Sequence, residues 1–289
     1  GDPFTKLSVE KSVSNIKARN IFKSVNYKAV NGTSDDLKII DIAVEEKPTG
    51  EISAGAGFGT EGGVFAFTIN ENNYLGKGNR LGFDFNLSKD SLKGRLNYTN
   101  PNYDFLGNSV SYYVSSTTND KADQGYENTI SGAGIKTSFE QFKDIYASLG
   151  LSFDYDDLKT TSGASDSLKK QSGTFSELSA DYGFTYDKRD RKFMPTDGSI
   201  TSFSQSIPLM ADRAFISNQF IRSSYASINE DVITAAKFYI KAINGIGNDD
   251  VRLSKRAGLP STRMRGFEAG KIGPLDGADH VGGNYAAAL

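Results

Sequence analysis

An arginine set between small and aromatic residues is the feature of this chain that could form a specific polar anchor. The tetrapeptide Met264-Arg265-Gly266-Phe267 lies in a glycine-rich connection, at about residues 248–283, that also carries Arg263 and Lys271. Connections longer than about fifteen residues are usually functional or disordered. A planar guanidinium can bind a carboxylate through two charge-assisted hydrogen bonds. The pattern therefore predicts a loop built to place an arginine.

Other motifs that could bind a ligand or take part in a reaction do not occur in the sequence context that such a role needs. Residues 57–62 match the glycine pattern of a dinucleotide-binding loop, but a strand pattern follows where a helix is needed, so a hairpin turn is predicted. Asp154-Tyr155-Asp156-Asp157 lacks the glycine and terminal glutamate of a calcium loop, so we expect it at a solvated loop mouth. Because no nucleophile, base and orienting group occur together, we expect no enzyme, cofactor or metal site.

The composition excludes several further kinds of functional site. The 289 residues include no Cys and one His, and their net charge is −2. Without Cys there is no disulfide or thiolate chemistry, and a single His cannot build a multi-histidine metal site. The near-neutral charge gives no sign of nucleic-acid binding. No apolar run reaches the roughly 18 residues of a membrane helix, but alternating transmembrane strands need no such run.

The first fifty residues predict a small α+β unit. Near-helical spacing of apolar residues predicts an amphipathic helix over about residues 7–20. Strand patterns follow at residues 25–30 and 37–46, with turn-forming residues between them. Glu46-Lys47-Pro48-Thr49-Gly50 then breaks the pattern. We therefore expect one unit at residues 1–47 and a second at residues 48–289.

From residue 51 onward the chain has a period of two. Leu149, Leu151 and Phe153 alternate with Ser148, Gly150, Ser152 and Asp154, for example, so one face is apolar and the other polar. About a dozen such segments occur, each of roughly nine to twelve residues, which suits tilted membrane-spanning strands. The pattern predicts a mainly β fold with an antiparallel sheet.

A soluble barrel would have the same alternation with its apolar face inward. Soluble ligand-binding barrels close at about eight strands, whereas a dozen enclose a lumen too wide for side chains to fill. The polar face carries charges that suit a wet lumen, at Asp84, Lys93, Arg95, Asp154 and Asp181. We therefore expect an antiparallel transmembrane β-barrel.

Connection lengths favour the same arrangement. Long connections are predicted after odd-numbered strands, at about residues 116–126, 156–174 and 248–283, and shorter ones after even-numbered strands, as at residues 139–144. Barrels of the outer membrane have long loops on one side and short turns on the other.

Several segments resemble the BamA family of outer-membrane β-barrel assembly factors, which carry periplasmic POTRA domains followed by a 16-stranded barrel. Residues 45–51 are similar to the passage from the last POTRA domain into the barrel, and residues 73–79 to the first periplasmic turn. A later periplasmic turn is similar to residues 186–198, with motif residues Asp187, Arg189, Pro195, Thr196 and Gly198. Most specific is Met264-Arg265-Gly266-Phe267, which resembles the Val-Arg-Gly-Phe/Tyr motif of the sixth extracellular loop, with Met in place of Val.

The resemblance implies an incomplete barrel of about twelve of sixteen strands behind a partial POTRA domain. It also implies that the loop at residues 248–283 folds into the lumen, where the arginine meets an acidic residue of the wall. That residue and about four strands are expected beyond Leu289, so the chain should not close a barrel by itself.

The implied function is folding and insertion of outer-membrane β-barrel proteins by strand templating at a lateral seam. The first strand fits because Ser53, Gly55, Gly57 and Gly59 alternate with Ile52, Ala54, Ala56 and Phe58. Small side chains pack weakly while the backbone stays free to pair; alternatively, these glycines permit barrel curvature.

The implied partners are nascent outer-membrane β-barrel proteins, accessory assembly lipoproteins at the POTRA region, and outer-membrane lipid, without nucleic acid. The protein would reside in the bacterial outer membrane with its N-terminal unit in the periplasm. A two-partner-type secretion pore, a passive outer-membrane channel and a soluble lipid-binding barrel are the alternatives.

Overall fold

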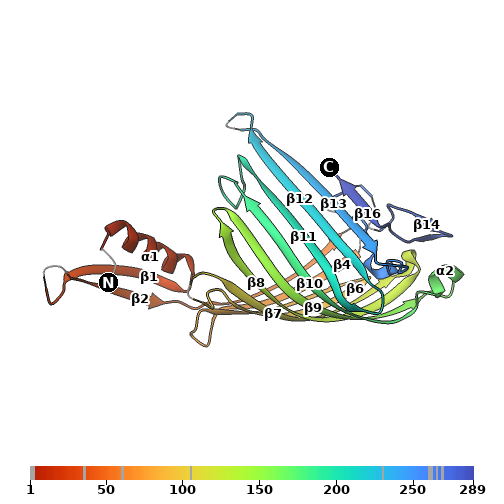
Figure 1. Cartoon of the computed structure of the whole chain (residues 1–289), viewed down its shortest axis with the longest axis horizontal. Coiled ribbons are helices and arrows are strands. Elements are labelled where there is room, and N and C mark those ends of the chain that lie inside the picture. Colours follow the sequence, from red (N-terminus) through yellow and green to blue (C-terminus); the bar gives the residue numbers. More distant parts are fainter. Residues whose placement is uncertain are drawn as a thin grey trace.

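A computed structural model describes residues 4–34, 37–59, 62–104, 106–229, 231–259, 263–264, 266–267 and 270–289. Figure 1 shows two parts, a helix on a two-stranded sheet and, beside them, a large curved sheet. Within the described residues, no helix has the length and apolar character needed to cross a bilayer.

The N-terminal unit is a helix packed on a hairpin. Helix α1 (Lys6–Ala18) begins at Thr5, whose side chain accepts a hydrogen bond from the backbone N–H of Ser8. Strands β1 (Phe22–Asn31) and β2 (Lys38–Glu46) pair antiparallel. Val13 of the helix and Val25 of β1 are buried. The predicted helix and both strands are thus present, and their ends lie within three residues of the predicted ones.

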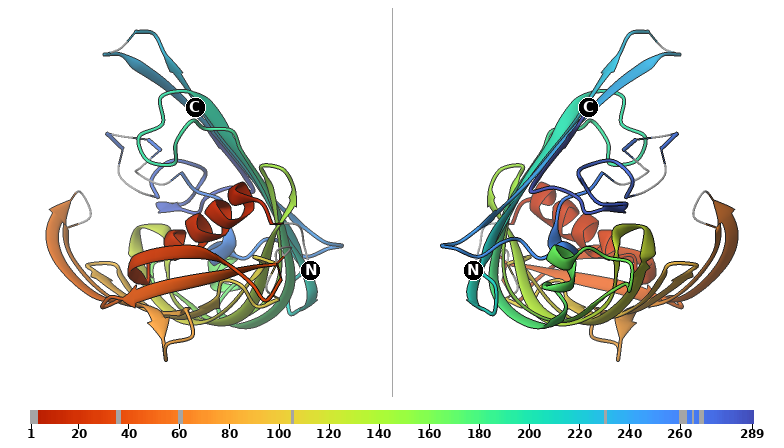
Figure 2. Two further views of the ribbon diagram at one scale, coloured as in Figure 1. Left: turned by 90° about the vertical axis from the view of Figure 1, so that its left-hand side faces the viewer. Right: turned by 90° about the vertical axis from the view of Figure 1, so that its right-hand side faces the viewer.

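The large sheet has twelve strands, and each strand pairs antiparallel with the strands next to it in sequence. They are β3 (Gly50–Gly59), β4 (Gly62–Tyr74), β5 (Asn79–Ser88), β6 (Ser91–Asn100), β7 (Ser109–Lys121), β8 (Tyr126–Phe142), β9 (Ile145–Thr160), β10 (Gly173–Asp187), β11 (Gly198–Ala211), β12 (Phe215–Ser227), β13 (Ile233–Gly245) and β16 (Tyr285–Ala288). Strands β3 and β16 form its two edges, and within the described residues they do not pair with each other. The predicted strand number is confirmed, and Figure 2 shows the sheet as an open trough.

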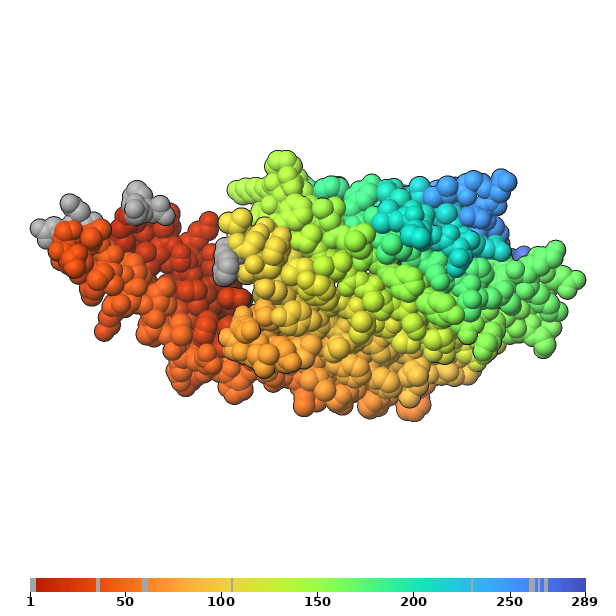
Figure 3. Space-filling model, turned by 60° about the horizontal axis from the view of Figure 1, so that its bottom comes forward, coloured from red at the N-terminus to blue at the C-terminus, as the bar shows by residue number. Residues whose placement is uncertain are grey.

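The strand register separates an apolar outer face from a polar inner face. One cross-strand row, for example, consists of Phe83, Leu96, Val114, Ala133, Phe153 and Leu178. Phe153 of this row is 45 % exposed. Figure 3 shows the convex side of the trough. Large apolar side chains thus lie on the convex outer face, as in the wall of a membrane β-barrel. In a soluble barrel they would point into the interior.

The strand ends differ from the predicted ones. We call the end of the sheet beside the N-terminal unit the near end and the opposite one the far end (Figure 1). Strand β7 continues to Lys121 and β9 to Thr160, so the predicted connections at residues 116–126 and 156–174 are too long. Strands β8 and β9 have 17 and 16 residues, more than predicted. Polar residues keep pairing beyond the apolar band, as in the 3.0 Å hydrogen bond between the hydroxyls of Thr118 and Thr129.

The predicted asymmetry of the connections holds only in part. At the far end, residues 161–172 and 246–284 form long connections, but the other far-end turns are short. The near end also has two medium connections, at residues 101–108 and 188–197. The far-end connections contain the short helices η1 (Ala122–Gln124), α2 (Asp166–Lys169) and η2 (Leu253–Lys255) and the hairpin β14 (Leu275–Asp276) and β15 (Asp279–His280).

Candidate functional site

The connection between β13 and β16 folds back onto the concave side of the trough (Figures 1 and 2). Its two arms are joined where the backbone N–H of Ala257 donates to the carbonyl of Gly283 at 2.7 Å, and that of Gly283 donates back at 2.9 Å. Residues 251–257, which we call the docked segment, lie against the inner wall. Val251, Leu253 and Ala257 of this segment are buried.

Arg252 is the central side chain of the docked segment. It is 1 % exposed. Its Nη2 lies 2.6 Å from Oε2 of Glu177 on β10, and its Nη1 lies 3.5 Å from Oδ2 of Asp156 on β9. The guanidinium also lies 5.1 Å from the ring centre of Phe175 and 5.6 Å from that of Phe215. Three strands of the wall, β9, β10 and β12, therefore hold one arginine of the loop between two carboxylates and two aromatic rings.

Further polar contacts fix the carboxylates in place. Asp156 accepts a 2.8 Å hydrogen bond from the Nδ2 of Asn128 and another from the hydroxyl of Ser254. Glu177 accepts one from Ser179 at 2.9 Å. Lys255 of the docked segment forms a second ion pair, with its Nζ 2.7 Å from Oδ2 of Asp154. Wall side chains thus hold one oxygen of Asp156 and of Glu177, and loop side chains hold the other.

Two apolar clusters flank these ion pairs. One joins wall, far-end connections and long loop: Tyr126, Leu158, Ala164, Leu168, Phe175, Leu253 and Val281. The other joins β12 and β13 to the docked segment: Phe215, Ile243, Val251 and Ala257. Much of the buried apolar core of the large sheet therefore lies where the loop meets the inner wall.

The energetics of the buried ion pairs favour a role in anchoring the loop over a role in catalysis. Removing one partner from a buried ion pair costs about 3–5 kcal/mol, because the other charge stays buried without compensation. Asp154, Asp156 and Glu177 outnumber Arg252 and Lys255 by one charge, so each cation is compensated. Across the described residues no cluster of His, Cys, Asp and Glu could hold a metal ion.

The predicted loop motif is only partly described. Arg265 lies outside the described residues. Met264 is partly buried, Phe267 is exposed, and Gly266 has a φ of +86°, which favours glycine. Arg263 lies over the ring of Tyr239 on β13, with 4.4 Å between its Cζ and the ring centre.

Sequence reasoning missed the arginine that the structure shows buried. Arg252 lies between Val251 and Leu253, and an arginine flanked by apolar residues at the start of a long loop could have signalled a docked segment. The prediction that Asp154 to Asp157 form a solvated loop mouth is wrong. These residues belong to β9, and Asp156 is 0 % exposed because the docked segment covers it.

The predicted turn motif at the near end forms a cross-braced connection between β10 and β11. Arg189 binds Asp187 through two hydrogen bonds, of 2.8 Å from Nε and 2.7 Å from Nη2. Asp190 accepts bonds from the hydroxyl of Thr196 at 2.6 Å and from its backbone N–H at 3.0 Å. The Thr196 hydroxyl bond is the main reason that the pKa of Asp190 falls to about 2. Pro195 precedes these donors in the chain.

Gly198 follows this connection as the first residue of β11. A side chain at this position would be in steric conflict with the turn. Its φ is +89°, and a Cβ at this position would lie 2.1 Å from the carbonyl oxygen of Lys188. The motif residues Asp187, Arg189, Thr196 and Gly198 are therefore brought together to shape one turn.

The predicted seam residues lie on the edge strand β3. Ser53, Gly55, Gly57 and Gly59 share the inner face, since Ser53 pairs with Thr68, which bonds to Asp84. Residues 51–58 are all exposed, and Phe58 at the far end of β3 is 96 % exposed. A Cβ added at Gly55 or Gly57 would meet nothing within 4 Å. The space around these two positions is open, so local packing does not require glycine there.

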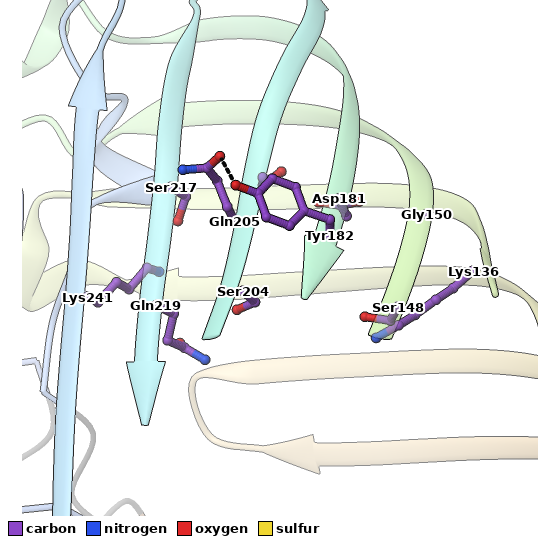
Figure 4. Close-up of a pocket in the computed structure, with 11 residues that line it drawn as sticks. Lys136, Ser148, Gly150, Asp181, Tyr182, Ser204, Gln205, Ser217, Gln219 and Lys241 are labelled. Carbon is purple, nitrogen blue, oxygen red and sulfur yellow. Dashed lines mark hydrogen bonds between the residues drawn. The ribbon is translucent and has the colours of Figure 1, made fainter. Parts of the chain in front are cut away.

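A cavity of about 210 Å³ also lies along strands β8 to β13, lined mostly by residues of the inner face. Figure 4 shows Lys241 of β13 and Lys136 of β8 at opposite ends of this cavity. Asp181 and Gln219 are also among the residues that line it. The inner face therefore suits water, as the alternation predicts.

The chain is similar to known proteins over most of its length. The model of the Omp85 superfamily domain matches residues 73–288. An outer membrane protein assembly factor BamA from Neorickettsia risticii is 28 % identical over 261 residues, which is 86 % of this chain and 34 % of that protein. A SAM50-like protein from Schizosaccharomyces pombe is 24 % identical over 305 residues, or 96 % of this chain and 61 % of that protein.

A solved structure has the same fold. The crystal structure of BamA from Haemophilus ducreyi lacking POTRA domains 1–3 superimposes with a TM-score of 0.81 at 23 % identity, covering 96 % of this chain and 59 % of that one. The resemblance to the BamA family is confirmed. The chain spans less than two thirds of the length of each of these relatives.

Proposed function

Since the chain belongs to the Omp85 superfamily, we propose that the protein containing it folds and inserts β-barrel proteins into the bacterial outer membrane, with β3 as the template strand. The similarity to BamA and to a SAM50-like protein supports an assembly factor of the outer membrane. The observation that carries the templating step is the long exposed edge of β3. The chain acts in this proposal by binding, without catalytic chemistry.

The β3 edge has the properties of a strand acceptor. One side of β3 pairs with β4 along ten residue pairs, and within the described residues its other side pairs with nothing. Soluble proteins protect such an edge because it recruits other strands. Strand addition uses main-chain hydrogen bonds for affinity, and the small residues Gly55 and Gly57 leave room for an incoming strand of any sequence.

The docked segment supports an assembly factor over a passive channel. Arg252, Lys255 and the apolar residues around them fix part of the long loop on the inner wall. A passive channel works best with an unobstructed lumen. A segment held by buried ion pairs narrows the lumen and braces strands β8 to β10 and β12.

The N-terminal unit completes the proposal. We assign α1, β1 and β2 to the end of a POTRA domain in the periplasm, where accessory lipoproteins would dock. Nascent β-barrel proteins are the proposed substrates, and the outer-membrane lipid surrounds the apolar face. The hydrogen bond from the backbone N–H of Asn72 to the carbonyl of Thr49, at 3.4 Å, links the start of β3 to the near end of β4.

The test uses the full-length protein in liposomes with an unfolded β-barrel substrate. The protein should accelerate substrate folding over protein-free liposomes. Gly55→Ala with Gly57→Ala should reduce the acceleration severalfold, because the added methyl groups take up the open space that the edge offers to an incoming strand. Gly94→Ala is the matched control, since a Cβ there also meets nothing within 4 Å but lies on the internal strand β6.

The possible outcomes separate the alternatives. No acceleration by the unsubstituted protein would overturn the assembly function, and ion conductance or export of a single partner would favour a channel or a secretion pore. Acceleration that Gly55→Ala with Gly57→Ala leaves unchanged would reject β3 as the template.

A further inference from the structure

The N-terminal unit and the near end of the large sheet have a cavity of about 560 Å³ between them, which we call the junction cavity. Its lining residues come from the last turn of α1, from the near ends of β4 and β5 with the turn between them, and from the connection at residues 101–108. Figure 1 shows the N-terminal unit beside this end of the sheet. The volume lies in the range of about 300–1,000 Å³ that is typical of ligand sites in proteins.

Two arginines line the junction cavity, one from each part of the chain. Arg19 is the residue that ends α1, and it is partly buried. Its guanidinium lies against the turn between β4 and β5, because a Cβ added at Gly78 would be 2.9 Å from its Nη2. Arg80 is four residues before Asp84 on β5, so it belongs to the inner face. The helix and the wall thus each contribute one cation.

Neither arginine is neutralised by the described part of the chain. No hydrogen bond, salt bridge or ring contact joins Arg19 or Arg80 to another described residue. The carboxylates next to the lining residues in sequence have other partners, since Glu71 binds the hydroxyl of Thr49 and Asp104 accepts hydrogen bonds within its own connection. Two uncompensated guanidiniums on one cavity attract an anion, and carboxylate and phosphate groups match their geometry.

The other lining residues decide between the possible anions. Ile16 and Leu106 are apolar, whereas Asn15 and Asn102 carry amides that can donate to and accept from a peptide backbone. No aromatic ring is among the described residues of the lining, so a nucleotide base has nothing to stack on. In the proposed membrane placement, lipid headgroups meet the outer face, whereas Arg80 belongs to the inner face. The lining therefore suits a peptide with an acidic side chain beside an apolar one.

We propose that the junction cavity binds an acidic segment of an incoming β-barrel substrate before that segment reaches β3. The substrate carboxylate binds Arg19 and Arg80 through charge-assisted hydrogen bonds. The neighbouring apolar side chain of the substrate packs on Ile16 and Leu106. This inference rests on the proposed function, from which it takes the class of substrate, but binding in the cavity does not depend on templating by β3.

The place of the cavity supports this occupant. Asn72 lines the cavity, and its backbone N–H donates to the carbonyl of Thr49 at 3.4 Å. Thr49 directly precedes Gly50, the first residue of β3. A segment held in the junction cavity therefore lies close to the start of the proposed template strand.

The experiment measures peptide binding to the full-length protein in detergent micelles by fluorescence anisotropy. One short labelled peptide alternates leucine with aspartate, and a second has asparagine in place of aspartate. Both can add to the edge of β3, so the readout is the ratio of their two affinities. The acidic peptide should bind about tenfold more tightly, the factor expected for a charge-assisted hydrogen bond.

Arg19→Gln with Arg80→Gln should bring this ratio close to one. Lys11→Gln with Lys93→Gln is the matched control, because it removes one exposed cation of α1 and one of the inner face, both outside the cavity lining. It should leave the ratio unchanged. Arg19→Glu with Arg80→Glu should instead prefer a peptide with lysine in place of aspartate, a gain of binding that misfolding cannot produce.

Equal affinities of the acidic and amide peptides for the unsubstituted protein would overturn the inference. A ratio that persists in Arg19→Gln with Arg80→Gln, or that Lys11→Gln with Lys93→Gln also removes, would place the binding elsewhere and reject the cavity. Displacement of the acidic peptide by an equal concentration of inorganic phosphate would assign the cavity to a free anion and reject a peptide ligand.

The substrate as the source of the segment is tested in the liposome assay. Excess acidic peptide should slow the accelerated folding of the β-barrel substrate, and the amide peptide should not. Peptide binding without this competition would assign the cavity to another protein of the periplasm and reject the substrate. Failure of the unsubstituted protein to accelerate folding would reject the proposed function, whereas peptide binding is measured without it, so the two failures are distinguishable.

Discussion

The guanidinium of Arg252 meets the carboxylate of Glu177 at 2.6 Å across 75 residues of sequence, and both side chains are almost completely buried. This contact joins the long loop to a strand in the middle of the wall. It lies in the part of the loop nearest β13, well before the Met264-Arg265-Gly266-Phe267 motif.

Arg252→Ala should release the docked segment. Asp156 and Glu177 would stay buried without their cation, at a cost of about 3–5 kcal/mol, and the loop would leave the wall to let water reach them. Hydrogen exchange of residues 251–257 should then increase strongly. Lys169→Ala, which removes an exposed far-end cation of α2, should have no effect. Unchanged protection in Arg252→Ala would contradict the anchoring role.

Gly198→Ala should destabilise the near-end turn more than Gly76→Ala. Both glycines have positive φ angles, which cost about 1–2 kcal/mol for other residues. At Gly198 the new methyl group would also strike the carbonyl of Lys188, whereas a Cβ at Gly76 meets nothing within 4 Å. Thermal unfolding midpoints of the two variants measure the difference, and equal midpoints would show that the steric contact is absent.

The turn braced by Asp190 should resist acid. Its folded pKa of about 2 lies below the ordinary value of about 3.9, chiefly because the Thr196 hydroxyl donates to the carboxylate. A lowered pKa contributes stability above the unfolded value, and this stability is lost as the pH falls through the folded value. Protection of the Thr196 and Asp197 amides should therefore persist at pH 5 and disappear toward pH 2.

Thr196→Val is the variant that checks this pH dependence. It removes the hydroxyl donor, so the pKa of Asp190 should rise and the loss of amide protection should begin at higher pH. Loss at the same pH in both proteins would assign the acid resistance to other groups.

Gln205→Ala should destabilise the wall in a bilayer. Its side chain accepts a 2.8 Å hydrogen bond from the Tyr182 hydroxyl and donates to Asn218, and the register places all three on the outer face. Losing the shared partner leaves two polar groups facing lipid, at a cost of about 1–3 kcal/mol. Gln219→Ala, on the inner face beside the cavity of Figure 4, should cost little in urea unfolding. Equal losses would contradict the face assignment.

The strands of the large sheet could be predicted because lipid and water impose opposite demands on alternate residues. Leu149, Leu151 and Phe153 face outward while Ser152 and Asp154 face inward, and no other information is needed to see this period. The far ends of β7 and β9 could not be predicted, since pairing continues through polar residues such as Asp156 and Thr118, where composition resembles a loop.

The anchor of the long loop could not be predicted for a different reason. Asp156 and Glu177 become partners of Arg252 only because β9 and β10 lie side by side and the loop folds back across them. Sequence pattern gives the polar face of each strand, but not which loop residue reaches it. The turn at residues 186–198 was identified through its resemblance to a family motif, and its contacts turn out to be local in sequence.

Strand templating by β3 is tested most directly by cross-linking during substrate insertion. Single Cys residues at Ile52, Ala54 and Ala56 of β3 would be introduced into the full-length protein, whose residues 1–289 contain no Cys. A Cys at Leu151, exposed on the internal strand β9, serves as control. The substrate carries single Cys residues along one strand, and an added oxidant closes disulfides between neighbouring thiols. If β3 is the template, disulfides should form from β3 to one strand of the arriving barrel in a fixed antiparallel register, and none from position 151. Equal cross-linking at position 151, or none at β3 while the substrate folds, would contradict it.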